Sequence, residues 1–279
     1  MRSVVDSHFH IFRRAQTQQA GILAAPYLQR DFDWADYRRA SAGVHLEGSV
    51  MVQVNDFTDP LTEVGWVASV AAEQAGPAAM VAYAQLEADR AAAQIAAVAA
   101  VPIVRGVRRN TQHEKDDHFC ARPEYIAGVR HLGALGLCCD VCVKAHQLDG
   151  VAVLAARCPE TTIVLNHLGK PDLTSDLVRW RADIERLAQA QNVVCKISVV
   201  VHTDRDPRLT DELAEPLVRG AVDAFGWDRV LFGSNWPVAL AVVGYSEWVE
   251  MLERILARAD ETDLQKLFVE NARRVYRLD

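Results

Sequence analysis

Short runs of β-branched and apolar residues alternate with longer helix-forming stretches along this chain of 279 residues. We predict eight strands, at residues 4–6, 49–54, 80–84, 103–107, 137–143, 162–165, 193–197 and 230–232. Alanine- and leucine-rich stretches predict helices at residues 63–74, 90–100, 123–135, 148–157, 177–190 and 213–225. Strands that are apolar throughout belong to parallel sheets covered on both faces. Eight βα units predict one α/β domain over residues 1–279, a (β/α)8 or TIM-like barrel, with an open doubly wound sheet as the alternative.

Two further segments complete this expected barrel. Residues 13–39 form a long polar stretch with scattered aromatic residues, which we expect to be an extended loop that walls an active site. Residues 246–258 and 261–276 predict two helices after the last strand, the second packing across one end of the barrel.

The composition restricts the partners and the location of the protein. Hydrophobic residues make up 50% and charged residues 24%, which is typical of a globular protein. The net charge of −7 argues against a nucleic-acid partner. Neither an apolar run of 18 residues nor a signal-peptide pattern is present, so we expect a cytoplasmic protein without a membrane partner. We interpret the six cysteines as buried structural thiols. A homo-oligomer is also compatible with the sequence.

Polar side chains gather where the predicted strands end. His8 and His10 follow the first strand two residues apart, so both lie on one side of it. Such a pair suits a shared metal ion or a shared oxyanion and water, although it could simply close a strand. The later strand ends carry Gln53, Asn55, Asp56, Arg108, Arg109, Asn110, Lys144, His146, Asn166, His167, Lys196, Ser198, His202 and Asn235. Active sites of (β/α)8 barrels lie at this end, so we predict the site there.

Four segments occur in an order that resembles a known family. They are Asp6-Ser7-His8-Phe9-His10, Asn166-His167-Leu168-Gly169-Lys170-Pro171, Phe232-Gly233-Ser234-Asn235-Trp236-Pro237-Val238 and Asn271-Ala272-Arg273-Arg274-Val275-Tyr276. The chain resembles the amidohydrolase superfamily, in its branch of sugar-lactone and pyrone-dicarboxylate lactone hydrolases. The resemblance implies a distorted (β/α)8 barrel that hydrolyses a ring ester or amide. In metal-dependent members, the H-x-H pair, a later histidine and an aspartate after strand eight hold a divalent ion.

Carried onto this chain, the resemblance implies a catalytic set of His8, His10, His167 and Asn235. The three histidines would bind zinc or manganese, unless the protein is metal-independent. Asn235 stands where aspartate is common, and an amide cannot act as a base near neutral pH. Either another group is the base, with His146, His167 and His202 as candidates, or the chain is a non-catalytic relative. A third alternative is an asparagine introduced to stop turnover.

We therefore expect a hydrolase that opens a small-molecule lactone, with a sugar lactone first. The residues predicted to contact the substrate are Gln53, Arg108, His146, Lys196 and Trp236, and Asn55 and Asn110 extend this polar rim. The guanidinium of Arg108 would recognise a carboxylate or a polyol through charge-assisted hydrogen bonds. Pyrone-dicarboxylate hydrolysis, metal-dependent decarboxylation and a non-catalytic binding barrel remain the alternatives.

Overall fold

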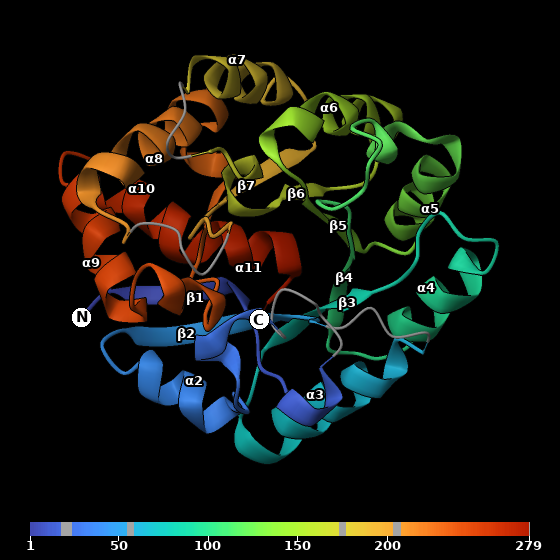
Figure 1. Ribbon diagram of the computed structural model, residues 1–279, viewed down its shortest axis with the longest axis horizontal. Coiled ribbons are helices and arrows are strands. Elements are labelled where there is room, and N and C mark those ends of the chain that lie inside the picture. Colours follow the sequence, from blue (N-terminus) through green and yellow to red (C-terminus); the bar gives the residue numbers. More distant parts are fainter. Residues whose placement is uncertain (18–23, 55–58, 173–176, 203–207, 279) are drawn as a thin grey trace.

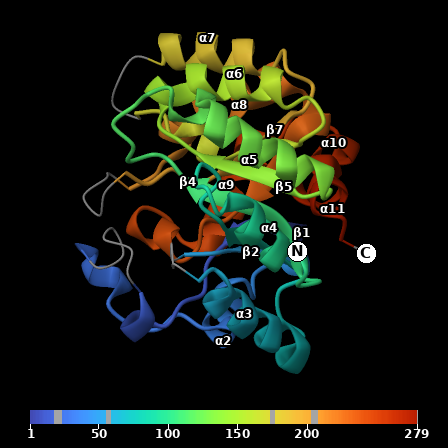
Figure 2. The same ribbon diagram turned by 90° about the vertical axis from the view of Figure 1, so that its right-hand side faces the viewer.

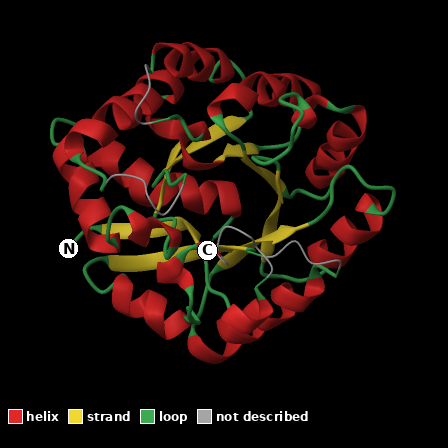
Figure 3. Ribbon diagram, in the orientation of Figure 1, coloured by secondary structure: helices red, strands yellow, loops and turns green. Residues whose placement is uncertain are grey.

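Eight parallel strands follow one another in chain order around a ring, which Figure 3 shows surrounded by helices. The computed structural model describes residues 1–17, 24–54, 59–172, 177–202 and 208–278. The strands are β1 (Ser3–Phe9), β2 (His45–Val52), β3 (Ala79–Tyr83), β4 (Val104–Asn110), β5 (Cys138–Cys142), β6 (Ile163–Leu165), β7 (Val193–Ser198) and β8 (Val230–Gly233). The predicted α/β barrel is confirmed. The open doubly wound sheet is wrong, because the order runs from β1 to β8 without a reversal.

The ring closes through a short junction rather than a full ladder. β1 and β8 meet at a parallel bridge between Phe9 and Trp236. Here the His10 N–H donates to the Trp236 carbonyl at 2.7 Å, and the Asn235 N–H donates to the His8 carbonyl at 2.7 Å. The pairing of β1 with β2 also changes register twice. The barrel is therefore distorted on the side where His8, His10 and Asn235 lie.

Helices cover the outside of the ring, as Figure 1 shows. They are α3 (Leu61–Gln74), α4 (Ala91–Ala99), α5 (Pro123–Ala134), α6 (Leu148–Arg157), α7 (Val178–Leu187), α8 (Asp211–Phe225) and α9 (Tyr245–Ile255). The predicted loop at residues 13–39 contains an additional short helix, α2 (Trp34–Ala40), and its residues 18–23 lie outside the described residues. Asp33 caps α2 by accepting from the Asp36 N–H at 2.8 Å, a local signal that marks a helix start.

The last predicted helix is divided. α10 (Glu261–Gln265) and α11 (Asn271–Tyr276) flank a π-helical segment, Lys266–Glu270. Figure 2 shows α10, α11 and the C-terminus together at one end of the barrel. Leu137, Thr162 and Val194, from the beginnings of β5, β6 and β7, line one cavity with Arg274 of α11. The C-terminal helix thus packs at the end where strands begin, which leaves the carboxyl ends open for a site.

The interior is filled by the apolar strand residues and also by several polar ones. All six cysteines are free and buried, in agreement with their interpretation as structural thiols. Asp6, His8, Asp140 and Lys196 are fully buried as well. Within the part of the chain that the structure describes, no helix has the length and hydrophobicity needed to cross a membrane.

Candidate active site

His8 and His10 lie side by side where β1 reaches the closing junction. Their Nε2 atoms are 3.3 Å apart. His10 Nδ1 is 2.7 Å from the Val52 carbonyl oxygen, so we assign the proton to Nδ1 and a lone pair to Nε2. His8 Nε2 then donates to His10, which leaves His8 Nδ1 without a hydrogen-bond partner among the described residues.

His167 reaches the same place from the opposite side of the barrel, just after β6. Its backbone has φ +51°, and Leu168 follows with φ +58°. This left-handed turn costs free energy for residues other than glycine and is typical of functional sites. The ring centres of His167 and His8 are 4.4 Å apart, and His167 Nδ1 lies 2.8 Å from Ser198 Oγ. The structure thus brings the three predicted histidines together.

Asn235 joins the histidines at the end of β8. It has φ +56°, a conformation that asparagine tolerates better than most residues. Its Nδ2 donates to the Val199 carbonyl at 2.9 Å, which fixes which end of the amide is the nitrogen. A carboxylate in this rotamer would place an oxygen against the Val199 carbonyl. The surroundings therefore match an amide.

Asp6 holds this arrangement in place, and sequence reasoning assigned it no role. Its Oδ1 accepts from the His8 N–H at 3.0 Å and the Ser234 N–H at 2.9 Å. Its Oδ2 accepts from Ser234 Oγ at 2.6 Å and from the Tyr37 hydroxyl at 3.0 Å. One buried carboxylate therefore joins the ends of β1 and β8 and fixes the backbone beside His8 and Asn235.

The three imidazoles are held in their neutral form. Burial and, after it, the charge of Arg108 lower the pKa of His10 from its usual 6.5 to about 3. Burial also lowers the pKa values of His8 and His167 well below the usual range. The neighbouring His167 lowers the pKa of His8 as well, and the charge of Lys170 lowers that of His167. Above pH 6.5, the site therefore offers nitrogen lone pairs and no imidazolium.

These shifts predict how stability depends on pH. The unfolded chain takes up protons near pH 6.5, whereas the folded site resists them until about pH 3 at His10. The free energy of unfolding should be at its maximum above pH 6.5. Below pH 6.5 it should decrease by about 1.4 kcal/mol per pH unit for each such histidine. Urea unfolding at pH 7, 6 and 5 measures this slope. His10→Asn should flatten the slope, whereas a change at the outlying His131 should not. Equal slopes in all three proteins would contradict the prediction.

A cavity of about 340 Å³ opens above His10, His167 and Asn235. Its other polar lining residues are Tyr27, Arg108, Asn110, Gln112, His113, Lys144, Lys170 and His202. None of the described residues that line it is Asp or Glu. His8 lies beneath the lining and is fully buried. The walls thus combine neutral imidazoles and amides with three cationic side chains.

Arg108 and Arg109 point in opposite directions. Arg108 is only 9% exposed, lines the cavity and donates from Nη2 to the Gln53 carbonyl at 2.8 Å. It forms no ion pair within the described residues. Arg109 turns away and pairs with Glu87 at 3.0 Å and Glu114 at 2.6 Å. A buried guanidinium without a carboxylate partner favours an anionic group of a ligand.

Lys196 lies in the barrel interior and does not line the cavity, in contrast to its predicted contact with substrate. Its Nζ is 2.6 Å from Asp140 Oδ2, and both side chains are fully buried. Asn166 Nδ2 donates to the same carboxylate at 2.8 Å, and the Tyr276 hydroxyl donates to it at 2.9 Å. Lys196 therefore belongs to a polar network below the histidines.

Three other predicted contacts also lie outside the cavity lining. Gln53 is buried, and its Oε1 accepts from the Tyr83 N–H at 2.8 Å. Trp236 packs edge-on against Phe32 and Tyr37. His146 is exposed, with Nε2 3.5 Å from an oxygen of Asp117. Asn55 and Asp56 lie outside the described residues. Lys170 and Gln112 line the cavity, although sequence reasoning gave them no role, and so does Lys144, which was predicted at a strand end without a specific role.

The residues present do not fit a tightly held divalent ion. One distance does suit a metal: the Nε2 atoms of His8 and His10 are 3.3 Å apart, close to the roughly 3.4 Å expected for two nitrogens on a tetrahedral zinc with bonds of about 2.0–2.1 Å. The other features argue against one. A ligating histidine normally donates its second N–H to an acceptor, but His8 Nδ1 has none among the described residues. No group of three or more His, Cys, Asp or Glu in the described segments could hold a metal. Asn235 supplies no negative charge, and Arg108 and Lys170 would repel a dication.

Comparison with known proteins places the chain in a family. The Amidohydrolase family model matches residues 5–278, and the chain therefore belongs to this family. It is 33% identical to an L-fucono-1,5-lactonase of Burkholderia multivorans, over 90% of this chain and 87% of that protein. A crystal structure of an amidohydrolase from Burkholderia multivorans with bound zinc covers 99% of both chains, with a TM-score of 0.87 and 31% identity. A 2-pyrone-4,6-dicarboxylate hydrolase of Comamonas testosteroni is 28% identical over 62% of this chain and 59% of that protein.

Proposed function

We propose that this amidohydrolase opens a lactone ring by hydrolysis, with a sugar lactone as the first candidate substrate. The relatives that act on lactones support the reaction class. The observation that carries the proposal is the cavity of about 340 Å³ over neutral His10 and His167, with Asn235 beside them. A cavity of this kind has room for a small ring and offers lone pairs that orient a water molecule.

His167 is the general base in this proposal. Of the three histidines considered as alternatives to an aspartate, His146 lies outside the cavity and His202 already contacts the Pro171 carbonyl through Nε2 at 2.9 Å. His167 can donate from Nδ1 to Ser198 Oγ, which leaves a lone pair on Nε2. This lone pair accepts a proton from water as the water oxygen attacks the lactone carbonyl carbon.

The remaining steps return that proton. The tetrahedral oxyanion collapses, the bond from the carbonyl carbon to the ring oxygen breaks, and the ring oxygen takes the proton from His167. The product is a hydroxy acid, which ionises to a carboxylate at neutral pH. Arg108, Lys144 and Lys170 supply the positive charge that stabilises the oxyanion and the product. No step is assigned to a metal ion, because the donor set does not fit one.

A carboxylated lactone, such as a pyrone dicarboxylate, is the second candidate substrate. Two observations favour it: none of the described lining residues is Asp or Glu, and the buried Arg108 has no ion pair among the described residues. Lys170 and Arg108 are the two charges that most lower the pKa of His167 after burial. A bound carboxylate would offset both charges and raise this pKa, which would make His167 a stronger base. Decarboxylation and ligand binding without catalysis have no comparable support.

Hydrolysis assays on aldonolactones and pyrone dicarboxylates test the proposal. We expect turnover of at least one lactone without added metal, and a decrease of about 10²–10⁴-fold in His167→Gln. His146→Gln is the matched control, since this exposed histidine lies outside the cavity. Turnover that depends strictly on zinc would overturn the base assignment, and a folded protein inactive on the whole panel would overturn the function.

Replacing Arg108 should weaken substrate binding more than folding. Loss of a charge-assisted hydrogen bond costs about 1.5–3 kcal/mol, so Arg108→Gln should raise KM by about 10- to 150-fold for a carboxylated lactone. Within the described residues Arg108 donates one hydrogen bond, to the Gln53 carbonyl, so the change in Tm should be small. Arg108→Lys keeps the charge and should recover part of the affinity. An unchanged KM with a large fall in Tm would instead show that Arg108 is structural.

A further inference from the structure

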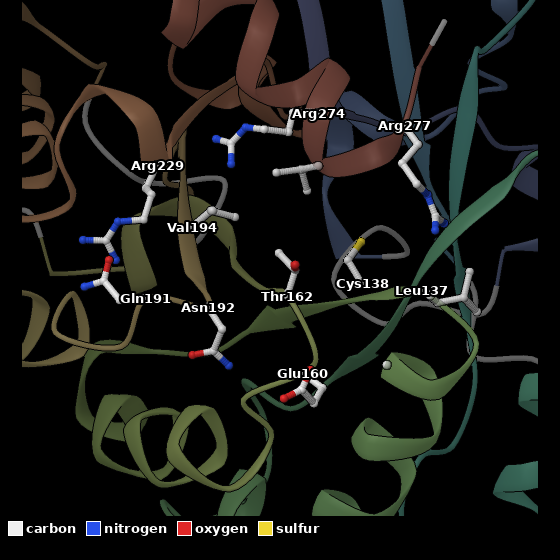
Figure 4. A pocket seen from close by; sticks show the side chains of 13 residues that line it. Leu137, Cys138, Glu160, Thr162, Gln191, Asn192, Val194, Arg229, Arg274 and Arg277 are labelled. Carbon is white, nitrogen blue, oxygen red and sulfur yellow. The ribbon is translucent and has the colours of Figure 1, made fainter.

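A second cavity, of about 310 Å³, lies at the other end of the barrel. Its walls come from the beginnings of β5 and β7, from the residue before β6 and from the end of α11. Three arginines contribute to the lining, namely Arg229, Arg274 and Arg277, and Glu160 is the single acid among the described lining residues. Figure 4 shows Arg229 and Arg274 on one side and Arg277 on the other, with Thr162 and Cys138 between them. None of these residues belongs to the proposed active site.

None of these three arginines forms an ion pair within the described part of the protein, although the charge of Arg274 contributes to lowering the pKa of Asp228. Arg229 donates from Nη1 only to backbone carbonyls, those of Ala188 at 2.9 Å and Ala190 at 3.0 Å among them. Arg274 contacts the carbonyl of Asp228 and donates to Asn271 Oδ1 at 2.9 Å. The carboxylate of Asp228 pairs instead with Lys266 at 2.8 Å.

Those carbonyl contacts support the chain locally without neutralising the charge. A guanidinium has five N–H donors, and these contacts use one nitrogen of Arg229 and one of Arg274. Burial of Arg229 lowers its pKa with no compensating carboxylate. Three such charges around one cavity are notable in a chain whose net charge is −7. They leave donors available for an anion.

Arg277 lies at the end of α11, close to Gly136. This residue closes α11 in a left-handed conformation with φ +51°. A Cβ at Gly136 would come within 2.9 Å of Arg277 Nη1, so the guanidinium at the end of this exposed side chain lies close to Gly136. Gly136 itself has φ +68°. The backbone N–H of Arg277 donates to the Arg273 carbonyl. Its side chain forms no hydrogen bond or ion pair within the described residues, so its N–H donors face the cavity unused.

We propose that this cavity binds a small organic anion with two separated carboxylate groups, one at Arg229 and Arg274 and the other at Arg277. Guanidinium groups bind carboxylates through paired, charge-assisted hydrogen bonds. Arginines on opposite sides of the cavity favour a ligand with two charged ends over a monoanion. Inorganic polyphosphate offers similar charges, and the experiment distinguishes it.

Isothermal titration at low ionic strength tests the proposal, with citrate, succinate, pyrophosphate and acetate as probes. It is carried out in an Arg108→Gln background, so that anion binding at the other end is weakened. Citrate or succinate should bind at one saturable site, and acetate should bind at least about tenfold more weakly. Arg277→Gln should raise Kd by about tenfold or more, since a bond to a charged group exceeds that factor.

Arg258→Gln is the matched control, because it removes the same charge from an exposed arginine of a different cavity. Arg277→Lys should restore part of the affinity, and the Tm without ligand checks that each variant is folded. Equal weakening by Arg277→Gln and Arg258→Gln, or no saturable binding, would overturn the site. Pyrophosphate that binds while both carboxylates fail would overturn the ligand class.

Discussion

Replacing Asn235 with aspartate is expected to raise lactone hydrolysis by about 10²–10⁴-fold, because the carboxylate adds a general base beside the histidines. The present base candidate, His167, is weakened by burial and by the neighbouring charges of Lys170 and Arg108. A carboxylate buried at position 235 would have a raised pKa, closer to neutral pH, where a general base works best.

The same substitution should destabilise the protein. The amide nitrogen of Asn235 donates to the Val199 carbonyl at 2.9 Å, and aspartate would replace this donor with an oxygen. Loss of a buried hydrogen bond that leaves an unsatisfied carbonyl costs about 1–3 kcal/mol. Added zinc should recover part of this loss in the aspartate variant, since an anionic ligand would then complement His8 and His10.

Rates on the lactone panel and urea unfolding, each with and without zinc, measure both effects. Asn235→Ala serves as the control, because it loses the bond to Val199 without gaining a base. It should show the stability loss alone. If the natural protein already turns over rapidly and the aspartate variant is no faster, the added carboxylate is not needed, and His167 carries the proton transfer by itself.

The sequence was sufficient to predict the barrel because its strands are apolar throughout and because helices separate them. The histidines could be located for the same reason: His8 and His10 lie at the end of β1, His167 follows β6 by two residues, and parallel strands end at one edge. The short helix α2 was missed because its signal is the local cap at Asp33 and not hydrophobic periodicity. The π-helical segment at Lys266–Glu270 could not be predicted, since it interrupts a stretch with an ordinary helical pattern.

Depth within the barrel decided which polar strand residues reach the cavity. Lys196 and Ser198 lie on the same face of β7, but they differ in height by about 6.6 Å. Ser198 contacts His167, whereas Lys196 lies one layer lower and pairs with Asp140. Arg108 and Arg109 are separated by a different effect, because successive residues of a strand face opposite sides of the sheet. Sequence alone indicates that the two arginines face opposite sides, but not which of them faces inward.

Loop geometry decided the remaining positions. His146 follows β5 by four residues and lies in the 3-10 segment Ala145–Gln147, which directs it toward Asp117. The cationic wall of the cavity depends on Lys144, Lys170 and Arg108 from three separate strand ends. Asp6 is adjacent to the H-x-H pair in sequence, yet its role becomes visible only when Ser234 and Tyr37 are placed around it.

The buried pair of Asp140 and Lys196 should give the largest loss of stability from a single substitution. Lys196→Met would leave the Asp140 carboxylate buried without its cation, where it accepts only from neutral donors such as Asn166 and Tyr276. Breaking a buried ion pair by removing one partner costs about 3–5 kcal/mol. Much of the stability of an ordinary domain, about 5–15 kcal/mol, would be lost.

The double variant separates the value of the pair from the cost of isolating one charge. Asp140→Asn with Lys196→Met removes both charges, so it should be less destabilised than Lys196→Met alone, because a buried pair replaced by uncharged groups is often close to neutral. Urea unfolding of the single and double variants forms the thermodynamic cycle. Arg254→Met is the control, since it breaks an exposed pair with Asp211 at 2.7 Å that should contribute at most about 1 kcal/mol. Additive losses in the double variant would mean that Asp140 and Lys196 stabilise the barrel independently, through packing rather than through their charges.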